Sequence, residues 1–208
     1  MTLDRLSLIQ WLSPTFPTGA FAYSHGLEQA MEDGMRDAAG VAAWVAHVLE
    51  HGGGWSDAVL LSMVLQGRDA DEVAELARAL AGSTERLAET MDQGRAFAAT
   101  LAALGHDLPL APLPVVLGLA ARTLVLRRPE IIAHYLHGFG GNLISAATRF
   151  LPLGQAEAQA VLAGLHGLVA DLAVRATDAG PQALETCCFG ADLAAMRHET
   201  LDVRIFRT

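Results

Sequence analysis

The chain has 208 residues, of which alanine and leucine together make up 70, about a third, whereas valine and isoleucine supply only 18. With 52% hydrophobic and 18% charged residues, it has enough apolar side chain for a buried core, and this composition excludes an intrinsically disordered protein. Alanine and leucine lose little side-chain freedom in a helix, and the β-branched residues that sheets favour are scarce. We therefore predict an all-α fold.

The charged residues exclude several further classes of protein. All 14 basic residues are arginines and no lysine is present, so the chain contains no P-loop and no Schiff-base or Ser-x-x-Lys catalytic centre. The net charge of −9 argues against a nucleic-acid-binding protein, which would normally carry a basic stripe. We expect no nucleic-acid partner.

The cysteines and the hydropathy pattern bear on the compartment. The two cysteines, Cys187 and Cys188, are neighbours, which does not suit a disulfide scaffold and fits a reducing cytoplasm. The N-terminus lacks the pattern of a signal peptide, and the most apolar stretch, residues 110–126, is interrupted by two prolines and an arginine. We expect a cytoplasmic protein without a membrane partner.

Helical periodicity runs along nearly the whole chain, and glycines, prolines and capping residues divide it. The loop at residues 13–19 contains two prolines and a glycine, which prevent helix continuation. We predict one domain, residues 1–208, of about nine or ten packed helices. The expected helices are residues 3–12, 20–32, 37–50, 55–65, 69–80, 83–104, 115–126, 129–151, 155–176 and 184–196.

The most catalytic-looking string is His47-Val48-Leu49-Glu50-His51. It has the H-x-x-E-H spacing that places two histidines on one helix face, where they could bind zinc with the glutamate as general base. Histidines at a helix C-terminus also complement the helix dipole without any metal, and the string names no third ligand. A small zinc hydrolase based on His47, Glu50 and His51 is therefore the alternative function.

Two segments differ from ordinary helix sequence. The N-terminal segment (residues 11–28) holds four of the twelve aromatic residues, and the C-terminal tail (residues 197–208) alternates arginines with Ile205 and Phe206. Arginine and aromatic side chains are enriched in protein interfaces, so both segments indicate docking surfaces. The candidate partner-binding residues are Phe16, Phe21, Tyr23, Ser24, Glu28, His198, Glu199, Arg204, Phe206 and Arg207.

These segments also carry a family resemblance. Residues 11–30 read WLSPTFPTGAFAYSHGLEQA, residues 152–155 read PLGQ, residues 196–199 read MRHE, and residues 204–207 follow the pattern Arg-x-Phe-Arg. In this order and spacing they resemble the urease accessory protein UreF family. The tail departs from the family pattern at Asp202 and Val203, where Tyr and Ser are usual.

The resemblance implies a helical accessory protein with no catalytic residues, no resident metal and no cofactor. It implies a homodimer that binds the accessory protein UreD (also called UreH) and recruits the GTPase UreG. The resulting complex would promote nickel insertion into the urease apoprotein, with modulation of the GTPase. The absence of a P-loop agrees with this, since nucleotide chemistry would belong to the partner.

Overall fold

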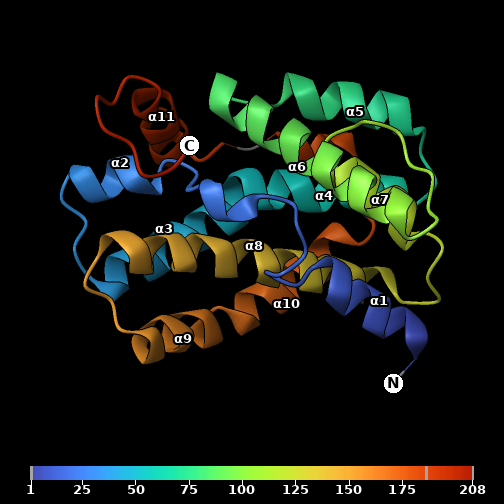
Figure 1. The fold of residues 1–208 in the computed structure, drawn as a ribbon, viewed down its shortest axis with the longest axis horizontal. Helices are drawn as coiled ribbons and strands as arrows, with labels where there is room; N and C mark the ends of the chain where they lie inside the picture. The colour runs from blue at the N-terminus through green and yellow to red at the C-terminus, as the bar shows by residue number, and fades with distance from the viewer. Residues whose placement is uncertain (1, 186, 208) are drawn as a thin grey trace.

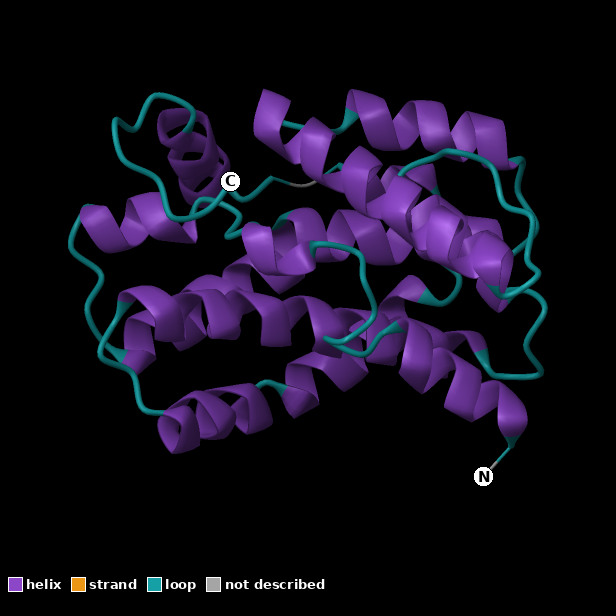
Figure 2. Ribbon diagram, viewed as in Figure 1, coloured by secondary structure: helices purple, strands orange, loops and turns teal. Residues whose placement is uncertain are grey.

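The computed structural model describes residues 2–185 and 187–207. Within these ranges eleven α-helices and two short 3-10 helices follow one another, and no strand occurs there (Figure 2). The predicted all-α fold class is therefore confirmed. The elements are α1 (Leu3–Trp11), η1 (Ala20–Ala22), α2 (Leu27–Glu32), α3 (Ala38–His51), α4 (Gly53–Leu65), α5 (Ala70–Ala79), α6 (Thr84–Ala103), α7 (Leu113–Ala121), α8 (Arg128–Phe150), α9 (Gln155–Gly164), α10 (His166–Ala176), η2 (Pro181–Leu184) and α11 (Phe189–His198).

Side-chain caps begin several helices where the sequence predicts. The Asp37 carboxylate accepts a hydrogen bond from the Gly40 N–H at 2.8 Å before α3. The Ser83 hydroxyl accepts one from the Arg86 N–H at 3.1 Å before α6, and Asp69 caps the first turn of α5. These bonds satisfy N–H groups that the first turn of a helix leaves without intrahelical partners.

Two of the predicted continuous helices are broken, and those predictions are wrong. Within residues 20–32 the chain forms η1 and then α2, because His25 and Gly26 adopt left-handed φ values of 52° and 73°. Residues 155–176 form α9 and α10, which meet at the buried Leu165. Gly164 and Gly167 flank that junction, and glycine is a poor helix former.

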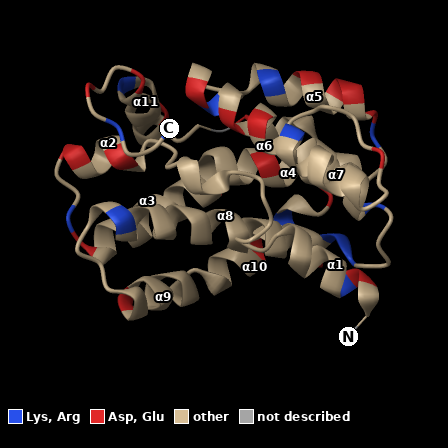
Figure 3. Cartoon of the chain, viewed as in Figure 1, with Lys and Arg blue, Asp and Glu red and all other residues tan. Residues whose placement is uncertain are grey.

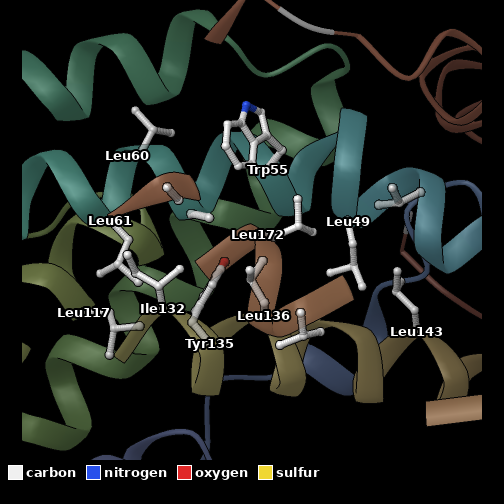
Figure 4. Packing of buried hydrophobic residues seen from close by; sticks show 14 of the residues in the cluster. Leu49, Trp55, Leu60, Leu61, Leu117, Ile132, Tyr135, Leu136, Leu143 and Leu172 are labelled. Atoms are coloured by element: carbon white, nitrogen blue, oxygen red, sulfur yellow. The ribbon is translucent and has the colours of Figure 1, made fainter. Parts of the chain in front are cut away.

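The centre of the molecule is α4, which packs against α3, α7, α8 and α10. Ten of its thirteen residues are buried, as expected for a helix that is apolar on nearly all sides. Figure 4 shows Leu61 of α4 among Leu117, Ile132 and other buried side chains from α7 and α8. In Figure 1, α8 runs along the middle of the view, with α9 and α10 on one side of it and α4 and α6 on the other.

The described residues contain no single helix that is both long enough and apolar enough to cross a membrane. The helices α9 and α10 pass that test only as a pair, and they are bent by 40° at their junction.

Glycines allow neighbouring segments to approach closely at two places in the core. A Cβ atom on Gly118 of α7 would lie 2.7 Å from the Cβ of Val64 in α4. A Cβ atom on Gly94 of α6 would overlap with the backbone carbonyl oxygen of Ala111. A backbone atom cannot rotate away as the end of a side chain can, so Gly94 tolerates no larger residue without movement of the chain.

We expect Gly94→Ala to lower the free energy of unfolding by about 1–3 kcal/mol or more, because the added methyl group overpacks the contact between α6 and residue 111. Urea unfolding followed by far-UV circular dichroism measures the change. Gly167→Ala is the matched control: its Cβ would meet nothing within 4 Å, so the change should stay within about 1 kcal/mol. Equal stability of the two variants would contradict the packing argument.

Candidate partner-binding site

The fold brings the N-terminal segment and the C-terminal tail together. The helix α11 packs on α2, and the chain then turns back so that the tail lies beside α2 and η1 (Figure 1). The N–H of Arg207 donates a hydrogen bond to the carbonyl oxygen of Ala22 at 2.6 Å. Two segments that the sequence singles out separately therefore form one surface.

The carboxylate of Glu28 holds the tail in place. This side chain on α2 is buried, with a residue exposure of 2%. Its Oε1 accepts a hydrogen bond from the Ile205 N–H at 2.8 Å, and its Oε2 accepts one from the Phe206 N–H at 2.9 Å. His198 Nε2 lies 2.9 Å from the same Oε2 atom. The cost of burying this carboxylate is offset only because the tail supplies hydrogen-bond partners for both of its oxygens.

A second carboxylate, Glu85 on α6, holds the other side of the tail. Its Oε2 lies 2.8 Å from His198 Nδ1, and its Oε1 accepts a hydrogen bond from the Arg204 guanidinium at 2.6 Å. Glu199 adds a cap, because its carboxylate accepts a hydrogen bond at 2.8 Å from the Thr84 N–H at the start of α6. A carboxylate at a helix N-terminus also interacts favourably with the helix dipole.

Aromatic rings and one arginine complete the contact. The Arg149 guanidinium of α8 lies 5.0 Å from the ring centroid of Phe21 and 4.4 Å from that of Phe206. It also donates a hydrogen bond to the Phe21 carbonyl oxygen at 2.6 Å. Burial lowers the pKa of Arg149, although the group stays charged at neutral pH. Burial raises the pKa of the Tyr23 phenol, and a hydrogen bond with Arg207 opposes that rise.

The ten candidate residues fall into two groups. Phe21, Glu199, Arg204 and Arg207 are exposed, whereas the other six are buried. Among the buried group, Phe16 packs on Phe97 of α6, with 5.4 Å between ring centroids. The buried residues are Phe16, Tyr23, Ser24, Glu28, His198 and Phe206. Binding of a partner by these ten residues remains a prediction, and the buried group can serve it by holding the exposed group in place.

A buried charge cluster that the sequence reasoning missed supports the N-terminal segment. It consists of His25, Asp57, Arg86, Glu89 and Tyr135. Asp57 Oδ2 lies 2.7 Å from the Arg86 guanidinium and accepts a hydrogen bond from the Tyr135 hydroxyl at 2.6 Å. His25 Nε2 lies 2.9 Å from Glu89 Oε1, which ties the N-terminal segment to α6. One signal was available: Asp57 is the only charged residue in the stretch 53–65, which apart from two serines is otherwise apolar.

Burial and charge oppose one another within this cluster. Burial alone would lower the pKa of Arg86, but the nearby charges of Asp57 and Glu89 outweigh it and raise that pKa. Burial alone would raise the pKa of Glu89, but His25 and Arg86 lower it. The pKa of Tyr135 is raised well above its ordinary value by burial and by the charge of Asp57. Arg86 and Glu89 therefore stay charged at neutral pH, and Tyr135 stays protonated.

The H-x-x-E-H string lies on α3, and its two histidines share one face of that helix as expected. The rings of His47 and His51, both on α3, stack on each other with 6.3 Å between their centroids. Glu50 Oε1 lies 3.5 Å from the Arg175 guanidinium. Nowhere in the described ranges do three or more His, Cys, Asp or Glu side chains form a group that could hold a metal ion. Cys187 and Cys188 are free thiols.

Comparison with known proteins identifies the class as the accessory proteins of urease. A urease accessory protein UreF from Cereibacter sphaeroides is 57% identical over 210 residues, with all of both chains covered. Those from a Jannaschia species and from Paracoccus denitrificans are 53% and 52% identical, covering 98% of this chain and 94% and 96% of their own. The UreF family model matches residues 35–166. The chain therefore belongs to the UreF family, which confirms the resemblance seen in its motifs.

We expect Arg86→Met to lower the free energy of unfolding by about 3–5 kcal/mol, because it leaves the carboxylates of Asp57 and Glu89 buried without their cation. Urea unfolding at neutral pH measures this loss. The defect should shrink as the pH falls, because in the variant these carboxyls take up protons more readily when folded than when unfolded.

Arg95→Met on the same helix is the matched control. Arg95 pairs with Asp92 at 2.8 Å, but both side chains are exposed, at 62% and 42%. Loss of such a surface pair costs about 0–1 kcal/mol. A defect in Arg86→Met no larger than that of Arg95→Met would show that the buried cluster contributes nothing specific.

Proposed function

We propose that this protein is a non-enzymatic urease maturation factor. In this proposal it assembles with UreD/UreH and the GTPase UreG, promotes nickel insertion into apo-urease and modulates the GTPase. It works in the cytoplasm as a homodimer, with no catalytic centre and no resident cofactor of its own. Membership of the UreF family supports the maturation role, and the lack of any lysine agrees with a nucleotide site that belongs to the partner.

The observation that carries the proposal is the exposed part of the surface that the N-terminal segment (residues 11–28) and the C-terminal tail form together. We call this surface the joined surface. Phe21 is 49% exposed, and Arg204 and Arg207 of the tail are exposed as well. Val203 and Ile205 add exposed apolar side chains, at 83% and 57%. Arginine and aromatic side chains are the types that most often dominate binding free energy at protein interfaces.

The buried part of the surface supports the same conclusion through preorganisation. Hydrogen bonds from Ile205 and Phe206 to Glu28 hold the backbone of the tail, so its exposed side chains are presented in a defined arrangement. Binding then costs less conformational entropy than it would for a free C-terminus. Figure 3 shows charged residues gathered around α2, α11 and the C-terminus, whereas the visible part of α9 carries few.

The test is co-purification from cells that express the chain with UreD, UreG and urease homologues. We expect the double variant Phe21→Ala/Arg207→Ala to lower the recovery of UreD or UreG by about tenfold or more, since interface hot-spot side chains contribute about 2 kcal/mol or more. Urease activation in the same cells should fall accordingly.

The matched control is Leu110→Ala/Arg95→Ala, which removes one exposed apolar and one exposed basic side chain outside the joined surface. This control should bind and activate as the unaltered chain does. The proposed site is wrong if both double variants behave alike. The proposed function is wrong if the unaltered chain recovers neither partner, and light scattering of the purified chain tests the homodimer.

A further inference from the structure

The imidazole of His198 is buried between two carboxylates. The residue has no exposed surface, yet Nε2 lies 2.9 Å from Glu28 Oε2 and Nδ1 lies 2.8 Å from Glu85 Oε2. An ionised carboxylate can only accept hydrogen bonds, so both contacts are satisfied only if both ring nitrogens donate. That requires the imidazolium form, or one extra proton shared among the three groups.

The charges around this ring balance only in that form. From α2 the ring faces Glu28, and from α6 it faces Glu85, which also binds Arg204 of the tail. One imidazolium and one guanidinium thus offset two carboxylates. Next to the ring in sequence, Arg197 is 58% exposed and points to Asp33 at 3.7 Å, and Glu199 caps α6.

Loss of the proton would disturb both contacts. A neutral imidazole has one N–H donor, so the lone pair of its other nitrogen would face a carboxylate oxygen less than 3 Å away. The site would also be left with one uncompensated negative charge away from water, which is costly. Glu28 is the acceptor for the Ile205 and Phe206 N–H groups, so the tail backbone depends on the same carboxylate.

We propose that His198 is a proton-dependent latch: the protonated ring ties the C-terminal tail to α2 and α6, and deprotonation releases residues 204–207. The direction follows from the number of donors: both contacts of the ring with Glu28 and Glu85 are satisfied only when both ring nitrogens donate, so docking is favoured at low pH and weakens as the pH rises.

The experiment uses the isolated chain, so its result does not depend on the proposed function. Nitrogen-15 shifts of the His198 ring report protonation, and the methyl resonance of Ile205 reports the position of the tail, from about pH 6 to about pH 10. Trypsin cleavage after Arg204, normalised to a free peptide at each pH, reports release independently. We expect deprotonation of His198, the change at Ile205 and faster cleavage to share one midpoint.

The decisive variant is Glu85→Gln. The amide group of the new side chain can donate to a neutral His198 ring while its oxygen still accepts from Arg204, so docking no longer needs the proton. We expect the tail of this variant to stay docked throughout the pH range. Release at the midpoint of the unaltered chain, or a neutral His198 ring with a docked tail in that chain, would overturn the proposal.

Two further variants complete the design. The side chain of His198→Gln has one amide donor group and no group that titrates in this pH range. The Ile205 resonance and the cleavage rate should therefore become independent of pH. At low pH the tail should be more open than in the unaltered chain. His47→Gln replaces an exposed histidine on α3 and should leave the transition unchanged. A transition that persists in His198→Gln, or disappears in His47→Gln, would assign the pH dependence to another group.

Discussion

The buried carboxylate of Glu28 is the point at which the two ends of this chain are joined. It lies on a helix of six residues, and its partners come from residues 198, 205 and 206. A buried carboxylate without donors carries a large desolvation cost, and in the described part of the chain the Glu28 carboxylate finds hydrogen-bond partners at the end of α11 and in the tail. This requirement directs residues 199–207 back across α2, and the position of the exposed arginines follows from it.

The same requirement explains why so many interface-like side chains are buried. Tyr23, Ser24 and Phe206 have the chemistry of a docking surface, but here they pack within the chain and position the neighbours that stay exposed. A surface built in this way has a rigid backbone and few freely rotating anchors, which lowers the entropy lost on association. The exposed Phe21 and Arg207 are thus held in place by contacts that are buried within the chain.

Helix α6 connects the two buried polar networks. Glu85 contacts the tail, while Arg86 and Glu89 belong to the charge cluster with Asp57 of α4 and His25 of the N-terminal segment. Successive helical positions point to different sides, so a single turn can serve both networks. The contacts of His198 with the two carboxylates and the charge cluster are shielded from solvent, so they depend less on salt than surface pairs do. A change in the position of α6 therefore alters contacts both with the N-terminal segment and with the tail.

The helical class, the capping residues and the two unusual segments are properties of the sequence itself, because propensity and caps act over a few residues. The breaks at His25 and at Leu165 could not be predicted in the same way, since a left-handed residue or a buried bend is selected by packing. The pairing of Glu28 with His198 and of Asp57 with Arg86 joins residues 170 and 29 positions apart. Only the tertiary structure decides such pairs. Burial removes the water that would solvate these charges, so each charge is stable only beside an opposite charge or a hydrogen-bond partner.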